Sequence, residues 1–324
     1  LAMTDTHDIT RPYILGIASS CDETAVALVT GDGRVAASEV ASQVDLHARF
    51  GGVVPEEAAR KHLEACLPLV EGARASAEAN WDDIHAVAVT SCPGLIGCLL
   101  VGVETAKALA WLHGKPLVAV NHLNGHLYAV HVTPVKGCHR LTEHGENFNA
   151  LPTSRNGEPA DTRVDRPDYP HVGLIVSGGH TSLVRATAPD HFETLATTRD
   201  DAVGEAYDKI ARALGLGYPG GPVIDRLATE GNPEAFPFTP PMMRKDKPGY
   251  SFSGLKTAVT REAEKLHAQH GPDLPDSVIK DLCASFQRAA VESLIVKAVD
   301  ALLASGDRDP VIDGDGACHE RRRR

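Results

Sequence analysis

The chain has 324 residues, of which 43% are hydrophobic and 23% are charged, and this is the composition of an ordinary globular protein. This length predicts about two domains and a core that needs no disulfide or structural metal. No apolar run approaches the roughly 20 residues of a membrane helix. Residues 1–11 lack the apolar core of a signal peptide, so we expect a cytoplasmic protein.

The cysteines and the net charge indicate the compartment of the protein and the kind of partner it can bind. The seven cysteines are scattered and include no C-x-x-C pair, which favours a reducing compartment over a disulfide framework or a thiolate zinc site. The net charge of -11 predicts that a nucleic-acid partner would need a local basic surface or a helper protein.

Residues 1–130 predict an α/β domain. Three apolar runs separated by turn residues indicate an antiparallel meander over residues 13–18, 24–30 and 34–40. A helix is expected to begin at Pro55 and to stop at Gly72. Further along come a strand over 84–90, a helix over 99–113 and a strand over 117–120.

Residues 131–170 differ from this pattern, because prolines interrupt a polar stretch without a sustained period. We expect a linker or surface insertion there. Residues 171–324 then repeat the opening device of strand, small polar turn, threonine and strand, with strands over 172–176 and 181–186. Helices are expected over 202–214, 224–229, 255–267 and 277–304, and a last strand over 310–313. The repetition predicts two related α/β halves facing across a cleft.

The strongest local signal for chemistry is a pair of histidines. His122 and His126 lie four residues apart, so they share one face of a helix that would begin at the end of a buried strand. Imidazoles in this arrangement can share a divalent cation, although two solvated histidines at a helix start have the same spacing. No glutamate follows His122, which disfavours a zinc hydrolase of the H-E-x-x-H type and thus an endopeptidase.

Two glycine-rich turns could bind a phosphate or an acyl group. One is residues 177–181 (SGGHT), and the other is residues 215–221 (GLGYPGG), before a helix expected near Pro222. Neither matches a known phosphate-binding fingerprint, and such turns are often turns and nothing more. The nearby acids have equally plain interpretations: Glu205 with Lys209, and Asp208 with Arg212, could form surface pairs, and Asp225 could favour the helix dipole.

Eight segments together resemble one family, the tRNA adenosine threonylcarbamoyltransferases, once described as O-sialoglycoprotein endopeptidases. The matching segments are residues 17–24 (IASSCDET), 51–56 (GGVVPE), 93–97 (PGLIG), 121–126 (NHLNGH), 176–181 (VSGGHT), 201–209 (DAVGEAYDK), 217–222 (GYPGGP) and 251–256 (SFSGLK). They occur in the family's order between residue 13 and about residue 300. Their number and order make the resemblance far more specific than any single motif.

The resemblance implies an actin-like ATPase fold, as in sugar kinases, Hsp70 and actin, with two duplicated subdomains around a cleft. It implies an acyltransferase that moves threonylcarbamoyl from threonylcarbamoyl-AMP to N6 of adenosine 37, in tRNAs reading codons that begin with A. It also implies one divalent cofactor ion, iron or zinc, and as partners tRNA, a paralogous dimer partner and a small P-loop ATPase.

The resemblance also assigns residues to roles. His122 and His126 would bind the metal, and Asp22 and Glu23 would lie near the reacting centre. The residues implied in binding the substrate are Ile175, Val176, Ser177, Gly178, Gly179, Asp208, Gly221, Asp225 and His319.

The chain departs from the family pattern in several places. Ala18 stands where the family has a glutamate, and Asn124 stands where a glutamate is common. Ser91 and Cys92 stand before Pro93 where the family usually has alanine and glycine. Near the C-terminus, His319 takes the place of a nucleotide-binding asparagine, and the family's metal-binding aspartate has no counterpart. We therefore expect weakened metal binding and low transferase activity, with Arg321–Arg324 as an altered chain end.

Two other functions remain open from the sequence. A non-catalytic paralogue could keep the fold as a scaffold, although the retained histidine pair argues for catalytic ancestry. A kinase or ATPase of the same fold that acts on a small molecule would phosphorylate a sugar or an acid and leave tRNA unmodified.

Overall fold

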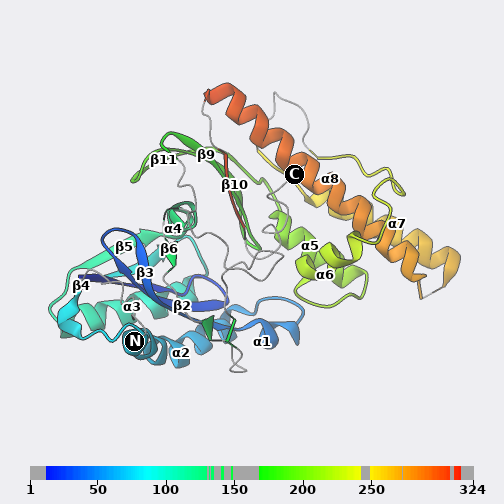
Figure 1. Cartoon of the computed structure of the whole chain (residues 1–324). Helices are drawn as coiled ribbons and strands as arrows, with labels where there is room; N and C mark the ends of the chain where they lie inside the picture. Colours follow the sequence, from blue (N-terminus) through cyan, green and yellow to red (C-terminus); the bar gives the residue numbers. More distant parts are fainter. Residues whose placement is uncertain are drawn as a thin grey trace, which may run out of the picture. The chain divides into compact units, whose positions relative to one another are not determined.

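The structure is a computed structural model that describes residues 12–129, 131, 133–134, 140–141, 147–148, 168–241, 249–271, 273–306 and 310–314. The chain divides into two compact units, Leu1–Arg166 and Pro167–Arg324 (Figure 1). Within the described ranges, no helix has both the length and the apolar character needed to cross a membrane.

The first unit is built on a six-stranded sheet with the strand order β5-β4-β1-β2-β3-β6. β1 (Tyr13–Ala18), β2 (Glu23–Thr30) and β3 (Arg34–Ser42) form the antiparallel meander that the sequence predicts. β4 (Ile84–Cys92) pairs parallel with β1, and β5 (Leu117–Asn121) pairs parallel with β4. Burial alternates along β2, as expected for a strand with one face on the core.

Helices α2 (Pro55–Ser76) and α3 (Ile96–Leu112) cover one face of this sheet (Figure 1). The expectation that Gly72 stops α2 is wrong. A Cβ at Gly72 would lie 3.7 Å from the Glu39 side chain, so this glycine brings the helix close to β3. α3 begins three residues earlier than predicted. α1 (Val44–Ala48) and the short helix η1 (Trp81–Asp83) have no counterpart among the predicted elements, and α4 (His122–Ala129) follows β5 directly.

The described part of the expected insertion contains short strands that its polar, unperiodic sequence did not indicate. β6 (Thr133–Pro134) pairs with the first residues of β3, and β7 (Arg140–Leu141) pairs with β8 (Asn147–Phe148). Each is only two residues long, too short to leave a recognisable period.

The second unit has a four-stranded sheet with the order β11-β10-β9-β12. β9 (His171–Val176) and β10 (Thr181–Ala188) form a predicted hairpin, β11 (His191–Thr197) extends it, and β12 (Pro310–Gly314) pairs parallel with β9. This order repeats β3-β2-β1-β4 of the first unit. The shared topology confirms the prediction of a duplicated α/β architecture of the actin-like class.

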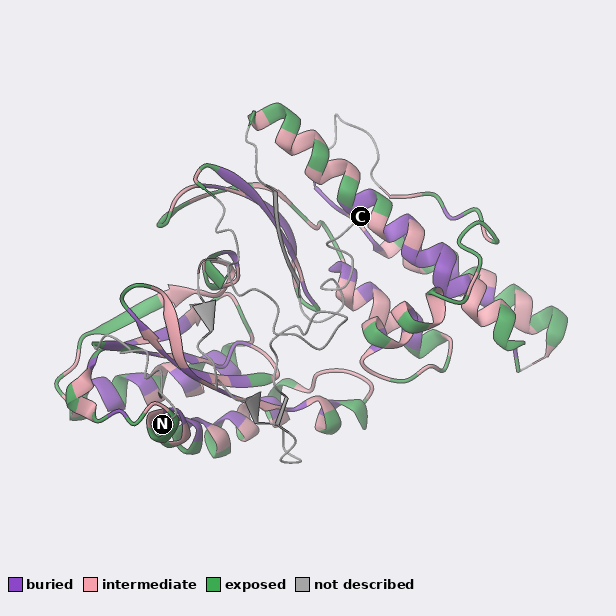
Figure 2. Cartoon of the chain, viewed as in Figure 1, coloured by how far each residue is buried: buried purple, intermediate pink, exposed green. Residues whose placement is uncertain are grey.

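The described residues of the second unit also form the helices α5 (Val203–Ala213), α6 (Gly220–Ala228), α7 (Ser253–His270) and α8 (Asp276–Ser305). α6 begins at Gly220 and not at Ile224, because Gly220 and Gly221 already form its first turn. The core of the unit includes Tyr250, Phe252 and Phe286, and α8 is buried on all sides over residues 282–287 (Figure 2).

Candidate functional site

The two histidines of α4 converge. Their Nε2 atoms lie 3.2 Å apart, and the ring centroids are 4.5 Å apart with the planes nearly perpendicular. The helix begins where β5 ends, and the Asn121 side chain caps it by accepting bonds from the backbone N–H groups of Leu123 and Asn124. The predicted placement of both histidines on one helix face after a strand is confirmed. The expectation that this strand is buried is wrong, because β5 lies at the edge of the sheet and its first three residues are exposed.

The geometry of the pair fits a shared cation. Two imidazole nitrogens bound to one tetrahedral Zn²⁺ lie about 3.3 Å apart, because each Zn–N bond is about 2.0–2.1 Å long. The same separation suits a hydrogen bond between two neutral rings. Within the described parts of the chain, no cluster of three or more His, Cys, Asp or Glu side chains is suited to a metal. The described residues therefore offer two nitrogen ligands.

The turn between β1 and β2 lies against this pair. The Ser20 hydroxyl is 3.4 Å from Nδ1 of His122, a long hydrogen bond. The Ser20 carbonyl accepts a 2.9 Å bond from the backbone N–H of Leu95, and a Cβ at Gly94 would come within 2.6 Å of that carbonyl. Gly94 therefore permits the close contact between the two turns.

Of the two acids in this turn, Asp22 is half-buried and Glu23 is exposed at the start of β2. The Asp22 carbonyl accepts a bond from the Gln43 backbone N–H, which fixes the backbone of the turn. Both acids are thus close in sequence to Ser20, the residue that contacts His122.

Two buried histidines behind the turn were not anticipated. His62 on α2 and His47 on α1 are fully inaccessible to solvent, and burial lowers the pKa of each. His62 bridges the Thr24 hydroxyl and the Cys21 carbonyl. His62 lies four residues from both Ala58 and Cys66 on the buried face of α2, so its helical spacing could have indicated burial.

In the second unit, hydrogen bonds between Ser177 and His180 close the turn between β9 and β10. Ser177 N–H donates to the His180 carbonyl, and His180 N–H donates to the Ser177 hydroxyl. Gly178 and Gly179 are exposed, neither has a left-handed φ, and an added Cβ on either would meet nothing within 4 Å. The fold itself does not require glycine at these two positions.

Helix α5 packs its first turn against this loop. Val203 N–H donates to the Thr181 hydroxyl over 2.8 Å, and a Cβ at Gly204 would come within 2.6 Å of the Ser177 carbonyl. Ile175 is buried in β9 and Val176 is half-buried at its end, so Ile175 can reach a ligand only through its backbone.

The predicted nucleotide residues lie on α5 and α6. The Asp208 carboxylate accepts a 2.7 Å bond from the backbone N–H of Gly220, which caps α6 and places Asp208 beside Gly221. Asp225 accepts a 2.8 Å bond from Gln287, whose carbonyl oxygen accepts from the Tyr207 hydroxyl. Gln287, from α8, was missed because it lies 62 residues from Asp225.

A charged cluster joins α5 to α7 and was also missed. Asp201 lies 2.7 Å from both Lys209 and Lys256, and Lys209 also pairs with Glu205, as the helical spacing predicts. Partial burial opposes ionisation of Asp201, but the two lysines outweigh it and lower the pKa of Asp201. Hydrogen bonds to Asp201 and Glu205 raise the pKa of Lys209 to about 12.

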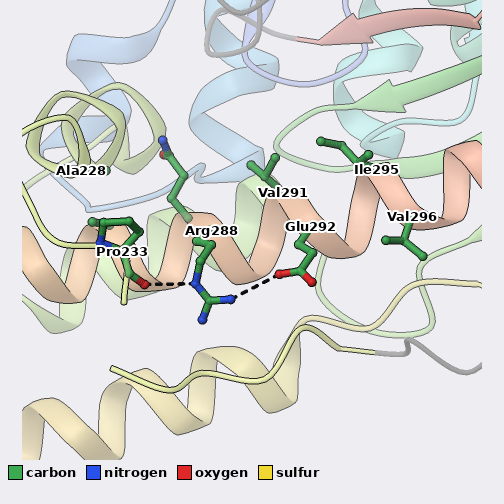
Figure 3. Close-up of a pocket in the computed structure, with 9 residues that line it drawn as sticks. Ala228, Pro233, Arg288, Val291, Glu292, Ile295 and Val296 are labelled. Atoms are coloured by element: carbon green, nitrogen blue, oxygen red, sulfur yellow. Dashed lines mark hydrogen bonds and ion pairs between the residues drawn. The ribbon is translucent and has the colours of Figure 1, made fainter. Parts of the chain in front are cut away.

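A cavity of about 430 Å³ opens along α8, and its lining includes the apolar residues Val291, Ile295 and Pro233 (Figure 3). Arg288 donates to the Pro233 carbonyl and pairs with Glu292 at its edge. None of the residues predicted for the site lines this cavity, although Gln287 does. His319 lies outside the described residues, so its role stays a prediction, as do the expected effects of the C-terminal residues.

Comparison with known proteins identifies the family. The model of the tRNA N6-adenosine threonylcarbamoyltransferase family matches residues 34–138 and 158–324. A protein of that name from Sorangium cellulosum is 45% identical over 95% of this chain and 80% of its own length. Its namesake from Symbiobacterium thermophilum is 46% identical over 96% of this chain and 81% of its own length.

Solved structures resemble the chain more distantly. Component A of the (R)-2-hydroxyglutaryl-CoA dehydratase of Acidaminococcus fermentans is 12% identical, covers 94% of this chain and 83% of its own, and has a TM-score of 0.48. YeaZ from Pseudomonas aeruginosa is 16% identical, with 59% and 72% of the two chains covered and a TM-score of 0.32. The family match and the close relatives, together with the observed strand order, show that this chain is a transferase of the tRNA N6-adenosine threonylcarbamoyltransferase family.

Proposed function

We propose that the chain transfers the threonylcarbamoyl group from threonylcarbamoyl-AMP to N6 of adenosine 37 in tRNAs that read codons beginning with A. The observation that carries this proposal is the convergence of the His122 and His126 Nε2 atoms, 3.2 Å apart, beside the Ser20–Asp22 turn. Family membership supports the type of reaction, and the histidine pair is the site at which we propose that it takes place.

His122 and His126 would hold a divalent ion, iron or zinc, through their Nε2 atoms. Such an ion would supply Lewis-acid polarisation of a carbonyl group and a template for the substrate. Because Ser20 contacts Nδ1 of His122, it orients the ring so that Nε2 faces His126.

The reaction is an acyl transfer with a good leaving group. The N6 amine attacks the carbamoyl carbon, the bond from that carbon to the phosphate oxygen breaks, and AMP departs. The amine is a weak nucleophile because its lone pair is delocalised into the adenine ring, so the enzyme must position it against the carbamoyl carbon. We propose that Asp22, with Glu23 beside it, accepts the proton that the amine loses.

The second unit would bind the adenylate. Gly178 and Gly179 border open space and carry no side chain, so a ligand could lie directly against their backbone. The backbone of Ile175 and Val176 and the Ser177 hydroxyl would contact the same substrate. So would Asp208, which caps α6, and Gly221 and Asp225 within that helix.

The experiment combines the chain with threonylcarbamoyl-AMP and unmodified tRNA, with its partner proteins present, and analyses the tRNA nucleosides by mass spectrometry. We expect threonylcarbamoyladenosine at position 37, and none when adenosine 37 is replaced by guanosine. A phosphorylated small molecule with unmodified tRNA would instead indicate a kinase of the same fold.

We also propose a docking surface for a paralogous dimer partner on α2 and α3. The two helices run side by side. Pro55 contacts Cys98 near their N-terminal ends and Cys66 contacts Thr105 further along, which shows that the helices run in the same direction. Their outer faces expose four large apolar side chains, namely Leu63 (67%), Leu67 (55%), Ile96 (85%) and Leu100 (58%). Apolar side chains gathered in this way favour a protein partner.

The variant Leu67→Asp tests this surface. It should weaken partner binding at least about tenfold, because a charge would be buried in an apolar contact. The control is Leu112→Asp, at a still more exposed leucine (68%) at the far end of α3. Equal binding by both variants in a titration with the partner would contradict the surface. The remaining partner, a small P-loop ATPase, and a location in the cytoplasm with the tRNA are proposed on family membership alone.

A further inference from the structure

The turn that carries Ser20 and Asp22 is held from behind by a buried hydrogen-bond relay. His62 on α2 lies 3.0 Å from the Cys21 carbonyl through Nε2 and 2.7 Å from the Thr24 hydroxyl through Nδ1. Both His62 and Thr24 are fully buried. One helix thereby fixes the middle of the turn and the first core residue of β2 that follows it.

The partners determine where the protons lie. A carbonyl oxygen can only accept, so Nε2 of His62 carries the hydrogen and donates it to Cys21. Burial lowers the pKa of His62, which keeps the ring neutral, so Nδ1 accepts the hydrogen of the Thr24 hydroxyl. Every polar atom of the ring is satisfied in one tautomer, and one orientation of the ring is thus specified.

A second buried histidine supports the same turn. Val54 N–H donates to Nδ1 of His47, and Nε2 of His47 donates to the Gln43 side-chain oxygen. The backbone N–H of Gln43 in turn donates to the Asp22 carbonyl over 3.1 Å. Consecutive carbonyl groups at Cys21 and Asp22 are therefore both fixed by a buried polar network.

On its other side, the turn meets the proposed reaction centre. Ser20 contacts His122, while Leu95 N–H holds the Ser20 carbonyl. We propose that His62 is a positioning residue, which holds the Cys21 carbonyl so that Ser20 orients His122 and Asp22 faces the reacting atoms. The catalytic part of this inference rests on the proposed function.

Three substitutions test whether His62 positions the turn or only fills space behind it. In His62→Gln, the longer side chain returns an N–H donor to the Cys21 carbonyl. In His62→Asn, the shorter amide reaches only toward Thr24. Asparagine also leaves a small cavity in this buried place, so packing alone would make it worse than glutamine. A third variant of unchanged volume, for which a role in packing alone predicts wild-type behaviour, therefore separates the two roles. Thr24→Val removes the hydroxyl that holds Nδ1 and leaves the volume nearly unchanged.

The first readout uses the protein without metal or substrate. Hydrogen exchange of the Leu95 and Gln43 amides reports the turn directly, because they donate to the carbonyls of Ser20 and Asp22. We expect exchange at least about tenfold faster in His62→Asn, and wild-type rates in His62→Gln. Unchanged exchange in His62→Asn would overturn the proposal. If that variant does not fold, the comparison passes to Thr24→Val, where unchanged exchange has the same meaning.

The second readout is the transfer reaction. His62→Asn should lower kcat about 100-fold, with KM for threonylcarbamoyl-AMP within about threefold of wild type, because the turn is misplaced and not removed. His62→Gln should restore most of kcat. Equal kcat in the two variants would overturn the positioning role. An inactive wild-type chain whose amides follow the predicted pattern would refute the proposed function but leave the relay intact.

Discussion

Gly125 lies between the two histidines of α4, inside a helix, where glycine is unfavourable. A Cβ at this position would meet nothing within 4 Å, and the φ angle is not left-handed. Since the fold does not demand glycine here, we attribute it to the space that a substrate needs beside the histidine pair.

We therefore predict that Gly125→Ala stabilises the protein by about 0.5–1 kcal/mol and lowers the transfer rate. Thermal unfolding and the nucleoside assay measure the two effects on the same sample. Gly31→Ala, in the β2–β3 turn and equally free of steric contacts, serves as the control that should keep full activity. A Gly125→Ala variant with wild-type turnover would refute the assignment of this space to substrate.

Residue spacing along the sequence predicts contacts within a helix but not contacts between distant elements. His122 and His126 were found because a separation of four residues on a helix brings side chains together. His62 and Thr24 lie 38 residues apart, and their contact depends on how α2 packs against β2. No local pattern encodes such a contact, so the buried relay could not be predicted.

At the scale of elements, the start of α7 depends on one carboxylate. Asp200 accepts bonds from the hydroxyl groups of Ser251 and Ser253 and from the backbone N–H groups of Phe252 and Ser253. Partial burial opposes ionisation of Asp200, but these donors outweigh it and lower the pKa of the group.

Asp200→Ala should lower the free energy of unfolding by about 1–2 kcal/mol, because it removes the acceptor for the first backbone N–H groups of the helix. Asp200→Asn keeps one acceptor oxygen and should lose less. Urea denaturation at neutral pH measures both variants. Equal stability of Asp200→Ala and wild type would show that solvent replaces the cap without loss.

The hairpins were the part of the fold that the sequence predicted well, because each has its own turn residues. Gly31–Asp32–Gly33 indicated the β2–β3 turn, and Ser177–His180 indicated the β9–β10 turn. β11 was missed because four of its seven residues are polar and exposed. The start of α6 was misplaced because glycines were interpreted as a loop, although Asp208 caps them as a helix.

At the scale of the whole molecule, the buried histidines link stability to pH. The pKa values of His47 and His62 are lowered by burial, while the charge of Asp22 opposes the shift in both and that of Glu57 does so in His47. The unfolded chain therefore takes up protons on these residues at a higher pH than the folded protein does. Stability is complete above the ordinary histidine pKa of about 6.5 and is lost as the pH falls toward the folded-state values.

We predict that the free energy of unfolding by urea declines between pH 7.5 and pH 5, and that the decline is smaller in the His47→Gln, His62→Gln double variant. Glutamine keeps hydrogen-bonding capacity without titrating in this range. The exposed histidine His85, replaced by glutamine, gives the control slope. Identical slopes in the double variant and the wild type would mean that other groups cause the pH dependence.

The central claim is that His122 and His126 act as one unit in acyl transfer to tRNA. Its most direct test is the single-turnover rate of threonylcarbamoyladenosine formation for His122→Ala, His126→Ala and the double variant, all with the same partner proteins. We predict that each single variant loses at least about 100-fold and that the double variant loses no more than either, because both nitrogens serve one site. Losses that multiply in the double variant, or a single variant with wild-type rate, would contradict the claim.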